Sequence, residues 1–449
     1  MMQPLAPALQ YSQGRSFNWS GAVLVNAFAE KDDGDKRADF AIMATPGLDL
    51  WATVGDGPNR GKIECAGVLY VVSGNSLYSV NASGASVLLG AISDADMARM
   101  ASNGSEVCIA AGGVGYVFSG GTLHTPLSYS VSDVAFADGF IMWTVQDTNH
   151  FIISALDDAL TYDGLDIASV EGSPDNLVGV CNNHRDIMFF KEKTTEVWYN
   201  SGASDFPFAR SGNAFIERGC FDRDSIVKID NSVNFVGDDR IIYTMNGYTP
   251  QRISTHVIEY MLRDATYARG WTYTEEGHKF YVLEVDRGTV VFDHSTGTWH
   301  VRQSFNSSWW RCNGNVDAYG LSLVTDRANG NIYTYSLDSM TENGDPISVE
   351  IDLPTLEYGR NLATMYAFEM TFETGIATSA APNPQAMLTY TDDGGHTWSN
   401  ELWRSLGKVG ETRKRAIWRA LGRFRTRQIK IRMTDAARKL VISYYADVR

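Results

Sequence analysis

Long apolar segments are absent from this chain of 449 residues. No run approaches the ~18 residues that a membrane-spanning helix needs, and the N-terminus lacks the basic start and apolar core of a signal peptide. We therefore expect no membrane-spanning segment. Cysteine is also scarce, and no CxxC pair occurs among Cys65, Cys108, Cys181, Cys220 and Cys312. Single, scattered cysteines predict buried thiols in a reducing compartment, with neither a disulfide framework nor a zinc site.

Motifs of catalysis and cofactor binding are missing as well. The eight histidines form no HExxH or HxH pattern, and no GxSxG elbow occurs. The glycine-rich stretch Ala111–Gly115 lacks the Lys-Ser/Thr of a phosphate loop, so it is predicted to be a hairpin turn. The acidic turn Asp32–Asp35 lacks the spacing of a calcium loop. We predict a protein that is not an enzyme and holds no cofactor and no metal.

Paired carboxylates are the remaining catalytic candidates, because a glycosidase needs two of them across a cleft. The pairs Asp222/Asp224 and Asp238/Asp239 follow strand-like runs and are flanked by turn residues. We interpret both as solvated turn residues.

Strand-forming patterns, in contrast, are abundant. Glycine is frequent (41 residues) and aromatic residues make up 12% of the chain, a mixture typical of all-β proteins with tight turns. The clearest unit is Lys279–Arg302, in which three runs rich in Val, Phe and Tyr are separated by short turns that contain Gly. Six further hairpins resemble it: 67–80, 106–118, 139–154, 186–199, 232–243 and 320–335.

The seven hairpins start about 33 to 47 residues apart, close to the period of propeller blades. We predict an all-β chain: a propeller of six or seven blades at 61–345, an irregular segment at 1–60 that closes it, and a C-terminal β-sandwich at 346–449. A pair of β-sandwiches is the alternative. Only Ile258–Tyr267 has a helical pattern, of one to three turns.

Charge is distributed unevenly. Residues 401–449 contain 14 Lys and Arg against 4 Asp and Glu, a net charge of +10. Because the whole chain has a net charge of −15, the first 400 residues have a net charge of −25. Such a split indicates that the two parts face different partners. The candidate interface consists of basic residues in the C-terminal strands: Arg413, Lys414, Arg415, Arg419, Arg423, Arg425 and Arg427.

The last three arginines alternate along the chain, which predicts one strand face with a break near Gln428, where the apolar residues change parity. Three interpretations of this basic face remain open. It is a solvated sheet face, an interface with an acidic protein neighbour that includes self-assembly, or a contact with DNA along a channel.

One short motif, Thr391–Trp398, fits the Asp-box pattern [ST]-x-D-x-G-x-T-W. In this pattern the Asp carboxylate accepts backbone N–H groups across a tight hairpin and the Trp packs beneath. Sialidases carry several such boxes, which makes a sialidase-like propeller glycosidase the main alternative function. A third possibility is a glycan-binding propeller that uses Trp309 or Trp310 as a stacking platform.

Both ends of the chain resemble a known family. Asn26–Glu30, Phe40–Ile42, Thr45–Leu48 and the Gly55–Gly61 turn resemble the opening of packaged-DNA-stabilisation proteins, the tail hub (nozzle) proteins of short-tailed bacteriophages. The ending is similar too, in the Thr391–Gly395 turn, Arg413–Arg415, Trp418-Arg419, Leu421–Arg425 and the strand at Ile429–Met433, and the middle matches in Thr195–Tyr199.

The resemblance implies a structural virion protein, made in the host cytoplasm and located in the tail. Such proteins look like β-propellers with an added β-domain that form a hexameric ring below the portal and its adaptor. They close the DNA channel after packaging, dock tailspikes or fibres, and hold a needle or plug. Double-stranded DNA would pass through the lumen without sequence-specific binding.

Overall fold

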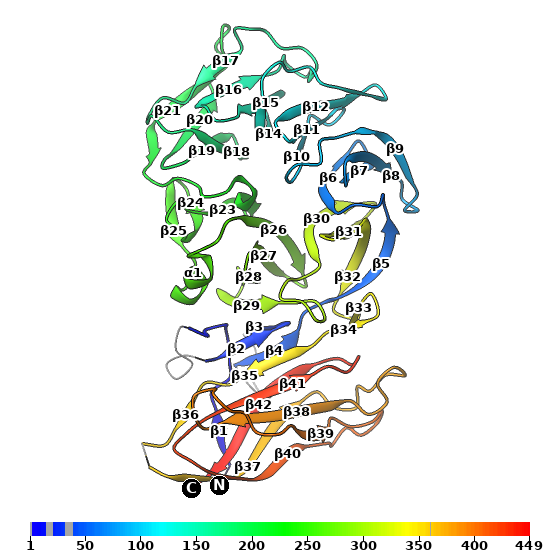
Figure 1. The fold of residues 1–449 in the computed structure, drawn as a ribbon, viewed down its shortest axis with the longest axis vertical. Helices are drawn as coiled ribbons and strands as arrows, with labels where there is room; N and C mark the ends of the chain where they lie inside the picture. The colour runs from blue at the N-terminus through cyan, green and yellow to red at the C-terminus, as the bar shows by residue number, and fades with distance from the viewer. Residues whose placement is uncertain (1, 15–20, 32–38, 360) are drawn as a thin grey trace.

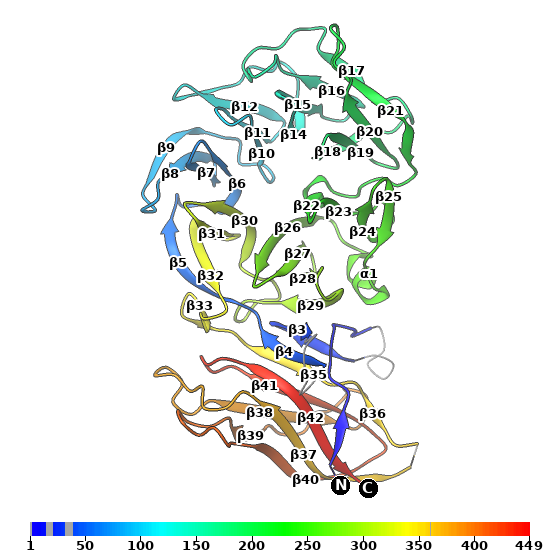
Figure 2. The same ribbon diagram turned by 180° about the vertical axis from the view of Figure 1, so that it is seen from behind.

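The structure is a computed structural model that describes residues 2–14, 21–31, 39–359 and 361–449. The molecule is elongated, with a ring of small sheets at one end and a two-layered sandwich at the other (Figures 1 and 2). Both chain termini lie at the far end of the sandwich. The predicted Asp32–Asp35 turn lies outside the described residues.

Seven four-stranded antiparallel blades surround a common axis within the described part of the chain, so the predicted six or seven blades are seven. Blade 1 consists of β6 (Asn59–Cys65), β7 (Val68–Ser73), β8 (Ser76–Val80) and β9 (Ser86–Ala91). Blade 2 consists of β10 (Arg99–Ser102), β11 (Val107–Ala111), β12 (Val114–Ser119) and β13 (Thr122–His124). Blade 3 consists of β14 (Val131–Ala137), β15 (Phe140–Val145), β16 (His150–Ile153) and β17 (Ile167–Ser169). Blades 4 and 5 are β18 (Leu177–Asn183), β19 (Asp186–Lys191), β20 (Thr195–Asn200), β21 (Phe208–Ile216); and β22 (Val227–Ile229), β23 (Ser232–Val236), β24 (Ile242–Asn246), β25 (Thr249–Arg252).

The last two blades join the ring to the rest of the molecule. Blade 6 is β26 (Ala268–Glu275), β27 (His278–Val285), β28 (Gly288–Asp293) and β29 (Thr298–Arg302), and blade 7 is β30 (Cys312–Ala318), β31 (Leu321–Asp326), β32 (Asn331–Ser336) and β5 (Gly47–Thr53). Strand β5 comes from the N-terminal segment and pairs antiparallel with β32. It therefore closes the ring with a strand distant in sequence.

Each hairpin predicted from the sequence is the middle pair of strands in one blade. The Lys279 unit, for example, forms β27 and β28, which pair through Val282 and Val291. The first strand of each blade lies nearest the axis and contacts the first strands of its two neighbours around the whole ring. Apolar side chains fill the layers between neighbouring blades in several separate clusters rather than one large core.

The helical prediction is confirmed in type and shifted in its bounds. Helix α1 spans His256–Leu262, and the Thr255 side chain caps it by accepting a hydrogen bond from the Ile258 N–H. Ile258 and Leu262 are buried in the apolar cluster between blades 5 and 6. The helix begins two residues early because of this cap, and it ends at Leu262 because the following residues turn into β26. A short 3-10 turn, η1 (Arg223–Ser225), precedes blade 5.

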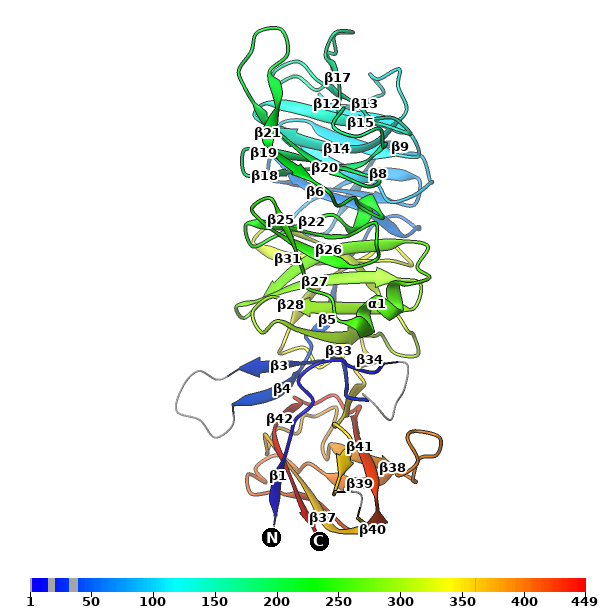
Figure 3. The same ribbon diagram turned by 90° about the vertical axis from the view of Figure 1, so that its left-hand side faces the viewer.

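The sandwich consists of two sheets (Figure 3). The first has the order β3-β4-β42-β37-β40, with β1 also paired to β42. Its strands are β1 (Gln3–Leu5), β3 (Ala27–Lys31), β4 (Phe40–Ala44), β37 (Ala363–Phe372), β40 (Ala416–Phe424) and β42 (Leu440–Val448). The second sheet is β2 (Val23–Val25), β35 (Val349–Asp352), β41 (Thr426–Met433), β38 (Gln385–Thr391) and β39 (Leu402–Ser405), with β36 (Leu356–Glu357) paired to β41. Two short strands, β33 (Thr341–Glu342) and β34 (Asp345–Pro346), extend blade 7.

Strand β2 joins blade 6 of the propeller and the second sheet of the sandwich into one continuous sheet. It pairs parallel with β29 of blade 6 on one side and antiparallel with β35 of the sandwich on the other. The first 60 residues thus contribute to both parts, since β5 belongs to blade 7 whereas β1, β3 and β4 belong to the sandwich. The sandwich core contains Trp418, Phe368 and Tyr444, all fully buried.

Candidate interaction surface on the C-terminal strands

The candidate basic residues lie on and around β40, at the end of the molecule opposite the propeller (Figure 1). Strand β40 is the edge of its sheet and pairs only with β37 among the described strands. Its apolar residues Ala416, Trp418, Leu421 and Phe424 are buried in the sandwich core. The intervening positions face solvent, which places basic side chains on the outer surface. Exposed in the structure are Arg413, Lys414, Arg415, Arg419, Arg423 and Arg425.

The prediction of one strand face for Arg423, Arg425 and Arg427 is wrong. Strand β40 ends at Phe424, and β41 begins at Thr426 in the opposite sheet, so the chain crosses between the two layers at Arg425. The change of apolar parity that suggested a break near Gln428 reflects this crossing, which lies three residues earlier. Alternation of residues cannot distinguish a bulge from a crossing between sheets.

Arg427 is a structural residue rather than part of the surface. Its side chain is 1% exposed and forms a two-pronged ion pair with Asp392, at 2.7 Å for both Nε and Nη2. Its Nη1 donates to the Leu421 carbonyl at 2.8 Å, and the guanidinium lies over the Tyr390 ring. A buried arginine needs this number of partners, because an unpaired charge in the core is costly.

The exposed arginines differ in their partners. Arg415 forms an ion pair with Glu369, with its Nε 2.7 Å from Oε1, which raises the pKa of Arg415 above its usual value. No described residue forms a hydrogen bond or ion pair with the side chains of Arg413, Arg419 or Arg423. These three cations are therefore free to meet a partner molecule.

A bulge shapes the outer surface of β40. Ala420 has φ +56° and Gly422 has φ +81°, and the register between β37 and β40 shifts where Tyr366 lies opposite them. A bulged edge strand that carries arginines is poorly suited to pairing with an added strand. We therefore expect partners to contact the side chains of this face rather than to extend the sheet.

Sequence reasoning missed the apolar residues beside these arginines. Tyr358, Leu362 and Tyr366 are 45%, 55% and 51% exposed, and Thr364 pairs directly with Arg423. Arg449 lies over the Tyr366 ring at 5.3 Å. Exposed arginine next to tyrosine is typical of protein interfaces. We call Arg419, Arg423 and Arg425 together with Tyr358, Leu362 and Tyr366 the basic tip.

The Asp-box forms the local structure that its pattern predicts. The Asp393 carboxylate accepts hydrogen bonds from the Thr397 backbone N–H at 2.9 Å and from the Thr397 hydroxyl at 2.5 Å. These bonds hold the pKa of Asp393 well below its usual range. Trp398 packs under Lys430, whose Nζ lies 4.8 Å from the ring centre. The box thus stabilises a turn of the sandwich after β38.

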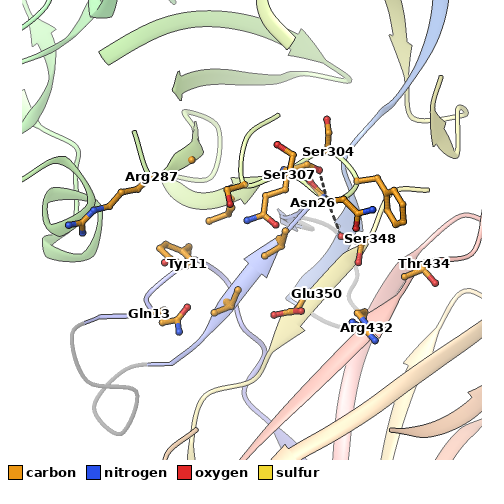
Figure 4. Close-up of a pocket in the computed structure, with 18 of the residues that line it drawn as sticks. Tyr11, Gln13, Asn26, Arg287, Ser304, Ser307, Ser348, Glu350, Arg432 and Thr434 are labelled. Carbon is orange, nitrogen blue, oxygen red and sulfur yellow. Dashed lines mark hydrogen bonds between the residues drawn. The ribbon is translucent and has the colours of Figure 1, made fainter. Parts of the chain in front are cut away.

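A cavity of about 740 Å³ lies where the propeller meets the sandwich (Figure 4). Asn26, which has φ +53°, joins the two parts there. Its Nδ2 donates to the carbonyls of Gln303 and Ser348, both at 2.9 Å, and its Oδ1 accepts the Gln303 N–H. The charged residues at the cavity are already paired, Glu350 with Lys430 and Arg432 with Glu401. Among the described residues that line this cavity, Glu350 is the one carboxylate, so they offer no pair suited to acid-base chemistry.

A second cavity of about 570 Å³ opens on the propeller axis. Charged side chains fill the axis next to it: Arg99 pairs with Asp133 at 3.1 Å, and Lys62 donates to the Asn313 carbonyl at 3.1 Å. Burial lowers the pKa of Lys62 to about 8 and raises the pKa of Asp224 to about 6. Charged side chains thus lie around the axis of the propeller.

The interpretation of the carboxylate pairs as solvated residues is wrong for Asp222, Asp224 and Asp238, which are partly buried, whereas Asp239 is exposed. Asp222 caps η1 by accepting the Asp224 N–H and also accepts the Ala268 N–H, both at 2.9 Å. Asp239 pairs with Arg218 at 2.8 Å and accepts the Tyr243 hydroxyl at the same distance. Asp222 lies in the connection between blades 4 and 5, and Asp239 lies in the β23–β24 turn within blade 5. These carboxylates carry hydrogen bonds that stabilise the two turns.

The proposed stacking platform is also occupied. Trp310 is buried with Arg302 stacked 3.6 Å from its ring centre, and Arg327 covers the Trp309 ring at 5.1 Å. Within the described ranges, no group of three or more His, Cys, Asp or Glu side chains could hold a metal ion. No helix in the same part of the chain is long and apolar enough to cross a bilayer. All five cysteines are buried and unpaired.

Comparisons with known proteins identify the family. Residues 9–341 match the family model of the bacteriophage P22 Gp10 β-propeller, and residues 348–449 match that of the bacteriophage P22 Gp10 β-sandwich. The chain belongs to the P22 Gp10 family. It is therefore a structural tail protein of the hub and stabilisation family of short-tailed phages, a component of the virion tail. The family is not known as an enzyme.

This Gp10-family chain is also similar to solved structures, one of which is a WD40 β-propeller. The WD40 β-propeller domain of Doa1 shares 11% identity at a TM-score of 0.42 and covers 65% of this chain and 97% of that one. BamB from Moraxella catarrhalis shares 11% identity at a TM-score of 0.40, over 75% and 96% of the two chains. No curated protein sequence matches this chain.

Proposed function

We propose that this chain forms a homo-hexameric ring below the portal and its adaptor protein. The ring closes the channel on the packaged DNA, docks tailspikes or tail fibres on its outside, and holds a tail needle or plug at its end. The chain is made in the host cytoplasm before it is built into the tail. Membership of the Gp10 family is the observation that carries this proposal.

Two features of the molecule support it. The propeller and the sandwich share the continuous sheet through β2, so the chain is suited to act as one rigid part in an assembly. Exposed arginines without internal partners on β40 provide a surface for an acidic protein neighbour. Double-stranded DNA would pass through the lumen of the ring, because the cavity on the axis of each propeller, about 570 Å³, is too small to hold a duplex.

The experiment is to measure the mass of the purified protein by light scattering, alone and mixed with the portal–adaptor complex, followed by negative-stain imaging. We expect a hexameric ring, formed either in solution or only on the adaptor. A monomer that does not bind the adaptor contradicts the proposal. A fluorogenic sialoside in parallel tests the glycosidase alternative, for which the expected result is no cleavage.

A further inference from the structure

Charge is concentrated at the two ends of the long molecule. Residues 131–217, which form blades 3 and 4 and lie at the end furthest from the sandwich, contain 14 Asp and Glu against 4 Lys and Arg. Residues 401–449 contain 14 Lys and Arg against 4 Asp and Glu. The balance is therefore −10 at one end and +10 at the other.

The acidic end also has exposed apolar residues. Leu156, Leu165 and Phe215 are 62%, 83% and 39% exposed. These residues form two groups on opposite faces of the ring. Leu156 and Leu165 lie in the β16–β17 loop with the exposed Asp157 and Asp163, whereas Glu171 and Glu217 are exposed near Phe215 on the face of the β19–β20 turn. The latter placement follows from Glu196, which pairs in register with Phe215 and accepts the Gly172 N–H at 2.7 Å. We call Glu171, Phe215 and Glu217, which share one face, the acidic pole.

We propose that the acidic pole of one copy docks on the basic tip of the next copy, head to tail. The proposal rests on the ring of the proposed function and assigns the surfaces that close it. Charge complementarity selects a second copy as the occupant, because the tip supplies arginines and tyrosines where the pole supplies two carboxylates and the exposed Phe215 ring. The two surfaces lie at opposite ends of one rigid molecule, so they can meet only between copies (Figure 1).

The geometry fixes the kind of interface. A contact between two different surfaces is heterologous. It closes into a ring when a whole number of the rotations that relate neighbouring copies adds up to 360°. Arg419 and Arg423 have no partner within the described chain, and the same holds for Glu171 and Glu217. No internal ion pair must therefore break when these groups meet, which favours association.

The test is a charge exchange in the full-length protein. R419E/R423E reverses the tip and E171K/E217K reverses the pole, and D56K/D94K on the exposed loops around blade 1 is the matched control for the pole variant. Assembly is followed by light scattering alone and on the portal–adaptor complex, at low and high salt. We expect each reversal to weaken assembly at least about tenfold, the combined variant to restore it, and high salt to weaken the wild type.

The outcomes separate the two proposals. If either reversed variant assembles into rings as well as the wild type does, the docking proposal is overturned and the hub function remains in place. Failure of the combined variant to recover, with circular dichroism showing both reversed proteins folded, also overturns the docking proposal. Failure of the wild-type protein to assemble at all, with or without the adaptor, contradicts the hub function itself.

Discussion

Raising the pH from 6 to 10 should weaken the contact between strand β3 and blade 6, because that contact depends on a protonated histidine. His278 of blade 6 lies between two carboxylates. Its Nδ1 is 2.7 Å from Asp293 Oδ2, and its Nε2 is 2.7 Å from Oε2 of Glu30 on β3. Both ring nitrogens can donate only when the imidazole is charged. Strand β3 belongs to the sandwich, so this histidine joins the two parts of the molecule.

The magnitude follows from the pKa of His278. The hydrogen bond to Asp293 is the main cause that raises the pKa from 6.5 to about 9, against the opposing effect of burial. One pKa unit corresponds to ~1.4 kcal/mol, so the charged histidine stabilises the fold by on the order of 3 kcal/mol. Because the folded pKa is the higher one, this stabilisation is complete below pH 6.5 and is lost as the pH rises to about 9.

The assay is urea unfolding of the wild type, H278Q and E30Q at several pH values. The difference between wild type and H278Q should shrink by about 3 kcal/mol from pH 6 to 10. Taking this difference cancels the contributions of other groups that titrate in the same pH range. Lys62 is one of them, and its lowered pKa makes stability rise with pH. H256Q, at a histidine whose side chain is 86% exposed, is the control. If the free energies of unfolding of the wild type and H278Q changed with pH in parallel, the reasoning would be refuted.

Three further predictions concern stability and the joining of the two parts. Arg427→Ala leaves Asp392 unpaired and should lower the free energy of unfolding by about 2 kcal/mol, since Asp392 is partly exposed, whereas Arg423→Ala should change it by less than about 0.5 kcal/mol in the same urea titration. Leu48→Ala, at a fully buried position of β5, should cost roughly 2–5 kcal/mol and a clear drop in melting temperature, whereas Leu50→Ala, at an exposed position of the same strand, should leave the melting temperature almost unchanged. Deletion of residues 1–26 removes β2 and should let limited proteolysis separate the propeller from the sandwich; deletion of residues 1–6, which removes only β1, should not, and equal resistance of the two deletions would contradict the role of β2.

Much of the propeller was predictable, because its middle strands carry strong local signals. The hairpins of β7–β8, β11–β12 and most other blades combine β-branched or aromatic runs with turns that contain Gly or Asn. The inner strands were missed: β10, for instance, is only four residues long and has no apolar alternation. The pairing of β5 with β32 and the position of β2 join residues about 280 to 330 positions apart, which no local pattern encodes.

The basic surface was predictable only in part. Composition located the charged segment, and six of its seven proposed residues are exposed, because arginine and lysine rarely lie in a core without a partner. Arg427 is the exception, and the reason is Asp392, a partner from another strand that the sequence does not place beside it. Tyr366 was missed for a similar reason, since the bulge opposite Ala420 turns it outward.

The use of the N-terminal segment has a consequence for how the molecule works as a tail component. Strand β2 fills the gap between blade 6 and the sandwich, the Asn26 side chain bonds to both Gln303 and Ser348, and β5 then completes blade 7. One short segment therefore closes the ring and attaches the sandwich to it. Bending the two parts against each other would break backbone hydrogen bonds of a continuous sheet, which are costly to leave unpaired when buried. A force applied at either end should thus reach the other end with little deformation, which suits the proposed role in a ring that retains DNA.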